Sequence, residues 1–175
     1  MAKTAFVKPS GGPVLQIPKS SLEIGLETAA ALGLLTMAFV MIKSWPLLPE
    51  TIPHHFGVSG KPDAWGGKGI LWLLPGISLM LYVGLTILRR YPHIYNYPWP
   101  ITEQNAATQY HLARTMIGAF KAEIVLIFVY LQWQTIQVAL GKAEGLGVAF
   151  LPIFLILIFG TIGIYFVKAY QTRQL

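Results

Sequence analysis

Four long apolar stretches, separated by polar segments rich in proline, glycine and aromatic residues, set the pattern of this chain. They cover residues 24–42, 69–88, 124–140 and 148–167. Each is close to the roughly 20 residues that an α-helix needs to cross the hydrocarbon of a bilayer. The pattern therefore predicts an all-α integral membrane protein with four transmembrane helices. They form a single domain over residues 21–175, after a basic, irregular tail of residues 1–20.

Helix signals flank these stretches. Ser20, or the serine after it, can cap the first helix, and Glu23 falls in its first turn, where the helix dipole favours a negative charge. Thr102 can cap the third helix, which would then begin at Glu103. Pro75 lies inside the second stretch and predicts a kink there, because proline lacks the amide hydrogen that a helix needs.

Composition supports the membrane class and changes how the charge is interpreted. The 175 residues are 54% hydrophobic and only 11% charged, whereas a soluble domain has about 25% charged residues. A net charge of +6 would suggest nucleic acid as the partner of a soluble protein. Here the basic residues flank apolar stretches, so we expect contact with lipid headgroups and no nucleic acid. The absence of cysteine excludes disulfides and thiolate metal sites.

The basic residues also predict an orientation. If the N-terminus is cytoplasmic, nine of them lie inside and four outside, which satisfies the positive-inside rule. We therefore expect both termini in the cytoplasm and the segment Leu48–Lys68 outside it. The nine are Lys3, Lys8, Lys19, Arg89, Arg90, Arg114, Lys121, Lys168 and Arg173, and the four are Lys43, Lys61, Lys68 and Lys142.

The segment Leu48–Lys68 concentrates the candidate chemistry. Its prolines and glycines predict a shaped, ordered loop between the first two helices. His54 and His55, with Glu50 or Asp63, are weak candidates for a metal site. Adjacent residues in extended backbone point to opposite sides, which argues against one ion shared by both histidines. We expect at least one histidine to have a structural role.

An enzymatic role finds little support. Glu50, His55 and Asp63 could converge as acid–base groups, but no nucleophile elbow, phosphate-binding loop or metalloprotease motif is present. We therefore expect no catalytic residue and no cofactor. We interpret the run from Asp63 to Lys68 as the entry to the second helix, with Trp65 anchored at the interface. The alternative is recognition of an extracellular peptide or ligand.

Three ionisable residues fall near the predicted cytoplasmic ends of the helices: Glu27, Lys121 and Glu123. A contact between Glu27 and Lys121 at this membrane boundary would lower the cost of holding each near the hydrocarbon. The alternative is a proton or ion path, which would need such groups strung across the bilayer.

One pattern of residues runs through the outer segment: Leu-Pro, Ile-Pro, histidine, an aromatic residue, glycine, aspartate, an aromatic residue, glycine and lysine. It is carried by Leu48, Pro49, Ile52, Pro53, His55, Phe56, Gly60, Asp63, Trp65, Gly66 and Lys68. This pattern resembles the signature of the DUF1648 domain family, which includes SdpI-like bacterial membrane proteins. A second block is similar to the segment after the second helix in that family. It includes Asn96, Pro98, Glu103, Asn105 and Tyr110.

The resemblance implies a small bacterial membrane protein, located in the inner membrane. Its best-known relatives protect a cell from a secreted toxic peptide and can hold a transcriptional repressor at the membrane. We therefore expect a non-enzymatic protein for recognition, immunity or signalling, in which the loop motif Pro49, Glu50, Pro53, His55, Phe56, Gly60, Asp63, Trp65 and Lys68 binds a ligand or shapes the loop. The partners would be the bilayer and a secreted peptide. The alternatives are an accessory subunit that docks on other membrane subunits and, less favoured, a metal-dependent membrane enzyme.

Overall fold

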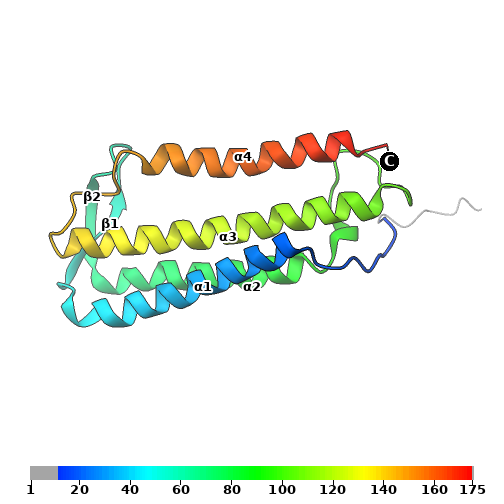
Figure 1. The fold of residues 1–175 in the computed structure, drawn as a ribbon. Coiled ribbons are helices and arrows are strands. Elements are labelled where there is room, and N and C mark those ends of the chain that lie inside the picture. Colours follow the sequence, from blue (N-terminus) through cyan, green and yellow to red (C-terminus); the bar gives the residue numbers. More distant parts are fainter. Residues whose placement is uncertain (1–11, 175) are drawn as a thin grey trace, which may run out of the picture.

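The computed structural model describes residues 12–174, which form a helical bundle with a β-hairpin at one end (Figure 1). Residues 12–20 form an irregular segment. The rest of the predicted basic tail, with Lys3 and Lys8, lies outside the described residues. The elements are α1 (Ser21–Ser44), η1 (Trp45–Leu47), β1 (Thr51–Phe56), β2 (Pro62–Gly67), η2 (Lys68–Trp72), α2 (Leu73–Leu88), η3 (Pro92–Ile94), α3 (Ala106–Ala139) and α4 (Phe150–Gln171).

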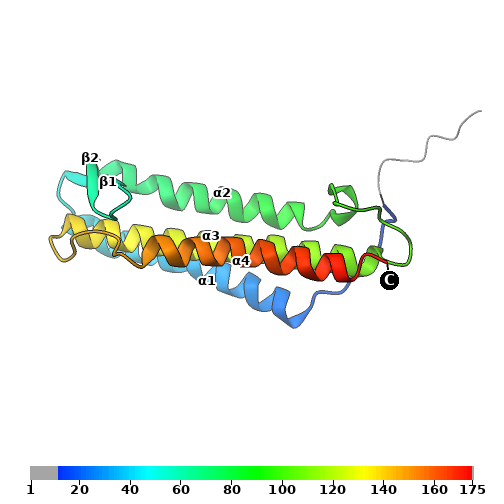
Figure 2. The same cartoon turned by 90° about the horizontal axis from the view of Figure 1, so that it is seen from above.

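The helix α3 is the centre of the bundle. It lies between α4 and the other two long helices in one view (Figure 1), and α1 and α2 flank it in the perpendicular view (Figure 2). Its buried positions recur every three or four residues, which is the period of one helix face. That face includes Gln109, Arg114, Lys121 and Gln132, so polar groups inside the bundle must find partners on neighbouring elements.

Three helical segments are long and apolar enough to cross a membrane: Ser21–Leu47, Lys68–Leu88 and Phe150–Gln171. The protein is therefore of the helical membrane type, as the apolar stretches predict. The predicted third span falls in α3, which is not among these three segments. α3 has 34 residues and runs alongside the others (Figures 1 and 2).

The starts of three helices can be compared with the signals in the sequence. Ser20 and Glu23 form a reciprocal capping box, with Glu23 N 3.2 Å from Ser20 Oγ and Ser20 N 2.9 Å from Glu23 Oε2. Pro75 lies in the first turn of α2, which begins at Leu73 directly after the 3-10 helix η2, and proline is tolerated in a first turn. α3 begins at Ala106 and not at Glu103, but Thr102 caps the turn that leads into it: Thr102 Oγ1 accepts from Asn105 N at 3.2 Å, and Asn105 Oδ1 accepts from Thr102 N at 2.9 Å.

The run from Asp63 to Gly67 is a strand and not the predicted helix entry. β1 and β2 pair antiparallel, with Thr51 opposite Gly67. The turn between them contains Gly60 at φ +76°, a conformation that favours glycine. The hairpin folds back onto the bundle because Ile52 is fully buried there. It packs in an apolar cluster with Met41, Leu48, Leu71 and Ile136.

Candidate functional site

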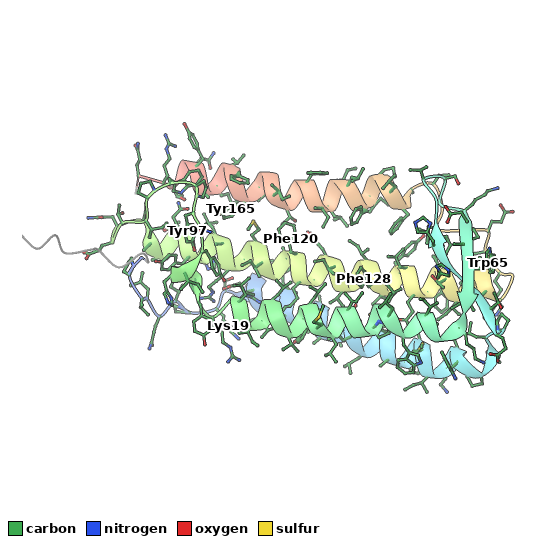
Figure 3. All side chains as sticks on the ribbon, turned by 180° about the vertical axis from the view of Figure 1, so that it is seen from behind. Lys19, Trp65, Tyr97, Phe120, Phe128 and Tyr165 are labelled. Atoms are coloured by element: carbon green, nitrogen blue, oxygen red, sulfur yellow. The ribbon has the colours of Figure 1, made fainter. Side chains whose placement is uncertain are left out.

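Two groups of side chains lie at opposite ends of the bundle. The first is the hairpin, defined as residues 50–68, and the second is the charge cluster, defined as Glu23, Glu27, Arg89, Arg114 and Lys121. Trp65 of the hairpin and Lys19, which precedes α1, mark these two ends (Figure 3). The residues that carry the loop motif all fall in or beside the hairpin.

The base of the hairpin is closed by Lys68. Its ammonium Nζ lies 2.9 Å from Glu50 Oε1, and its amide N donates to the Glu50 carbonyl at 2.9 Å. The same ammonium stands 5.4 Å from the centre of the Trp45 ring, which also packs on Trp72. These contacts fix the junction between α1, the hairpin and η2. Glu50 therefore faces Lys68 and does not join His55 and Asp63 in an acid–base triad.

The tip of the hairpin is held by the loop between α3 and α4. Leu146 N donates a hydrogen bond to the Gly60 carbonyl at 2.8 Å, and Tyr130 Oη donates to the Leu146 carbonyl at 2.6 Å. A Cβ atom on Gly145 would lie 2.1 Å from the same Gly60 oxygen. Only glycine allows this approach. Because Leu146 donates to Gly60, the hairpin is attached to the bundle at its tip as well as its base.

The two histidines have different neighbours. His55 Nδ1 lies 2.5 Å from Asp63 Oδ1 across the hairpin, and both side chains are more than half exposed. The His54 ring instead lies against Gly66. Within residues 12–174, no three His, Cys, Asp or Glu side chains converge in a way that could hold a metal ion. The register of β1 against β2 shifts on both sides of His55, so the two histidines lie in an irregular part of the strand and their rings do not share neighbours.

Apolar side chains are exposed on the same hairpin. Val58, at the turn, is 95% exposed, and Trp65 of β2 is 52% exposed. Pro49 is also exposed, whereas Pro53 is buried and Phe56 half-buried. The hairpin thus presents apolar groups to its surroundings, which is typical of a contact surface.

At the other end, Glu23 of α1 is the centre of the charge cluster. It is fully buried and accepts hydrogen bonds from Arg114 Nε at 3.1 Å and from Arg89 Nη2 at 3.1 Å. Arg89 follows the last residue of α2, and its guanidinium lies flat against Gly118 of α3, where a Cβ atom would come within 3.1 Å of Cζ. One carboxylate therefore ties α1 to α2 and α3.

Glu27 lies one turn further along α1 and uses both of its oxygens. Lys121 Nζ donates at 2.6 Å, Arg89 Nη1 at 3.0 Å and Tyr82 Oη at 2.6 Å. Lys121 also donates to Thr86 Oγ1 at 2.8 Å. The structure thus joins Glu27 and Lys121 directly, as expected from the sequence. Glu123, the third residue of that set, is not part of this cluster: it accepts a hydrogen bond from Thr161 of α4.

Sequence reasoning missed both arginines of the cluster as partners of Glu23. In the sequence these two residues count only as topology signals. Glu23 is separated by 66 residues from Arg89 and by 91 from Arg114, so no local pattern connects them. The only available signal was the spacing of Arg114 and Lys121, which lie two helical turns apart and therefore on one face of a helix.

The second motif is split between the interior and the surface. Asn105 and Tyr110 are buried, whereas Asn96, Pro98 and Glu103 are exposed. Asn105 Nδ2 donates to the carbonyls of Pro100 at 3.2 Å and Arg173 at 2.9 Å. The buried residue Asn105 of this motif therefore connects the start of α3 to the end of α4.

Gln109 adds to this junction and was not singled out from the sequence. Its Oε1 accepts from Trp99 Nε1 at 3.0 Å, and its Nε2 donates to the Ala169 carbonyl at 2.9 Å. Tyr95 and Tyr97 stack nearby with ring centres 6.1 Å apart. Burial raises the pKa of Tyr95 to about 12, and burial raises the pKa of Tyr97 further. Both phenols therefore stay neutral at physiological pH.

Sequence comparisons find one domain family and one relative, and neither has an assigned activity. The profile of a domain of unknown function, DUF1648, matches residues 31–79, which cover most of α1, the hairpin and the start of α2. An uncharacterized protein of Archaeoglobus fulgidus is 31% identical over 97 residues. The match covers 51% of this chain and 50% of the archaeal protein, so the chain spans about half the length of that relative. No solved structure matches.

Proposed function

Because the chain carries a DUF1648 domain, we propose that it is a non-catalytic membrane protein that recognises a polypeptide through its hairpin. The observation that carries this proposal is the exposure of Val58 and Trp65 on a frame fastened at both ends. A surface that is already ordered loses little conformational freedom on binding. Exposed aromatic and aliphatic groups supply the apolar contact area that such a partner needs.

The proposal includes a topology. All four long helices cross the membrane, with both termini in the cytoplasm, so that the hairpin faces outward in a bacterial inner membrane. The nine-to-four distribution of basic residues supports this orientation, and Lys19 lies at the end opposite the hairpin (Figure 3). The 34 residues of α3 give a length of about 51 Å, which exceeds the roughly 30 Å of the hydrocarbon.

A secreted peptide is the partner that the hairpin fits best. Within the described residues β2 pairs only with β1, so its outer edge has backbone groups that an extended peptide can pair with. Trp65 stands on that strand and Val58 at its turn. A protective role against a toxic peptide, or signalling in response to one, would use this surface.

The test is site-specific photo-crosslinking in native membranes, with the reactive residue placed at Val58 or Trp65. We expect a crosslinked polypeptide from both positions. Val14 is the matched control, because it is also an exposed valine, 77% exposed, but it precedes α1 at the other end. No product, or the same product from Val14, would contradict recognition by the hairpin.

A cell-based test addresses protection. Deletion of the chain should sensitise cells to a secreted peptide, and Trp65→Ala or Asp63→Ala should fail to restore resistance, whereas Val14→Ser should restore it. Asp63→Ala removes the contact with His55. Unchanged sensitivity on deletion would contradict the immunity form of the proposal.

An accessory subunit is the second candidate function, and the exposure of α4 favours it. A groove of about 480 Å³ separates α4 from α3 and is lined mainly by apolar groups, including Leu126, Ile127, Phe150 and Phe154. A helix of another membrane subunit could pack there. This candidate requires stoichiometric co-purification in mild detergent, which should weaken when residues 1–20 are removed. Recovery of the chain alone would contradict it.

A metal-dependent enzyme is the least favoured class. His54 and His55 have different neighbours, and the hairpin offers no third ligand among the described residues. Elemental analysis of the purified protein tests this directly. Bound zinc, copper or manganese at one ion per chain would replace the non-catalytic proposal with this one.

A further inference from the structure

A cavity of about 670 Å³ opens beside the charge cluster. One wall is the irregular segment of residues 15–19, and the opposite wall is formed by Thr86, Arg89 and Arg90 at the end of α2. The first wall is fixed in place, because Arg114 Nη1 donates to the Ile17 carbonyl at 2.8 Å. The cavity is therefore bounded by elements that are tied together.

The lining of this cavity is strongly basic. It includes the side chains of Lys19, Arg89, Arg90 and Arg114 against a single carboxylate, Glu27. The two oxygens of that carboxylate already accept hydrogen bonds from three donors. Glu23 pairs with two of these cations, so four positive charges stand against two negative ones, and the remaining excess of two makes an anion the complementary ligand.

Two of the cations are available for a ligand. Arg89 and Arg114 bind Glu23, whereas the side chains of Lys19 and Arg90 make no ion pair or hydrogen bond within the described residues. Both are exposed. They belong to the two walls, one before α1 and one after α2. The guanidinium offers paired donors that suit phosphate oxygens, and the ammonium adds a point charge.

The position of the cavity further limits the kinds of ligand that could reach it. Lys19 lies two residues before the span that begins at Ser21, and Arg90 lies two residues after the span that ends at Leu88. Both therefore lie where lipid headgroups meet the ends of transmembrane helices. Leu15, Pro18 and Pro92 add apolar surface to the lining.

We propose that this cavity binds a phosphate-bearing ligand, with Lys19 and Arg90 as its contact residues. The phosphate belongs to the headgroup of an anionic lipid or to a soluble phosphate compound. The buried charge cluster shapes the floor of the site and contributes its positive field. This site is separate from the hairpin, so a negative binding result here would leave the proposed function of the hairpin unaffected.

In the experiment, the purified chain in neutral detergent is titrated with each of three probes. Its thermal unfolding midpoint is measured at each concentration. The probes are phosphatidylglycerol, the zwitterionic phosphatidylcholine and inorganic phosphate. Phosphatidylglycerol should raise the midpoint and phosphatidylcholine should not, because the site selects net negative charge. A rise with inorganic phosphate as well would assign a soluble phosphate source, and a rise with phosphatidylglycerol alone would assign the lipid. No rise with either probe would overturn the proposal.

The variants locate the binding. Lys19→Gln with Arg90→Gln should weaken the binding of phosphatidylglycerol roughly 30-fold, since each basic residue near a membrane surface contributes about 1 kcal/mol. Lys61→Gln with Lys142→Gln removes the same charge from two exposed lysines near the hairpin and should change the affinity less than about twofold. Lys19→Arg with Arg90→Lys keeps the charge and should keep binding. Equal weakening by the first two pairs would overturn the site.

Discussion

Lys121 of α3 donates a hydrogen bond to Glu27 of α1 over 2.6 Å, although 94 residues separate the two in the chain. The ammonium is fully buried, and Glu27 is 30% exposed. A buried ion pair contributes less than its Coulomb attraction suggests, because both ions lose hydration. Removing one partner is much more costly, because it leaves the other charge buried without compensation.

A double-mutant cycle tests this pair. Glu27→Gln and Lys121→Gln should each lower the free energy of unfolding by about 2–4 kcal/mol. Together they should cost less than the sum, with a coupling of about 1–3 kcal/mol, because the second change removes the orphaned charge. Unfolding in detergent, monitored by circular dichroism, measures all three variants. Glu50 and Lys68 form the matched pair at 2.9 Å, with Glu50 88% exposed, and their coupling should stay below about 1 kcal/mol.

Glu23 should be the least replaceable carboxylate. Glu23→Gln keeps the shape of the side chain but leaves Arg114 buried without an anion, so we expect a loss of about 3 kcal/mol in the free energy of unfolding. Glu103→Gln is the control: Glu103 is exposed and should change stability by less than about 0.5 kcal/mol. Equal stability of the two variants would contradict a structural role for the charge cluster.

The close approach of Gly145 to Gly60 predicts that the tip of the hairpin is sensitive to one methyl group. Gly145→Ala would bring Cβ to 2.1 Å from the Gly60 carbonyl oxygen, so the loop must move and the hydrogen bond from Leu146 is lost. We expect a cost of about 1–3 kcal/mol and faster hydrogen exchange at the Leu146 amide. Gly69→Ala is the control, since a Cβ there meets nothing within 4 Å. Unchanged exchange at Leu146 would show that the attachment is unimportant.

The stacked tyrosines after α2 predict a loss of stability in alkali. Burial raises the pKa of Tyr95 to about 12 and raises the pKa of Tyr97 further, whereas in the unfolded chain a tyrosine has a pKa of about 10. The unfolded chain therefore releases protons first, so this contribution is complete below pH of about 10 and declines as pH rises through about 12.

The slope of stability against pH measures this effect. Tyr97→Phe removes one titrating group, so the free energy of unfolding should decline less steeply above pH of about 10. The change in slope is at most about 1.4 kcal/mol per pH unit, and less because the ring is only partly buried. The variant also loses the hydrogen bond from Tyr97 Oη to the Pro92 carbonyl, which lowers stability at every pH. An unchanged slope would contradict the role of burial.

Much of the architecture follows from local sequence. The apolar stretches indicated the helices, and Ser20 with Glu23 indicated the start of α1, because helix length and capping depend on residues within a few positions of one another. Local rules failed for the hairpin. Its strands carry Pro53, Gly66 and Gly67, which disfavour strands by propensity. The strand pairing is stabilised instead by the burial of Ile52 against the bundle and by contacts with another loop.

The sequence by itself determined that this is a helical membrane protein. It also showed which polar and charged residues lie between the apolar stretches. Only the tertiary structure decided which of those residues act together. Glu23 was recognisable as a capping residue, yet its pairing with Arg89 and Arg114 depends on how three helices pack. Likewise Lys19 and Arg90 are ordinary flanking bases in the sequence and become two walls of one cavity. A charge near hydrocarbon must find a partner, but the fold selects which partner comes within reach.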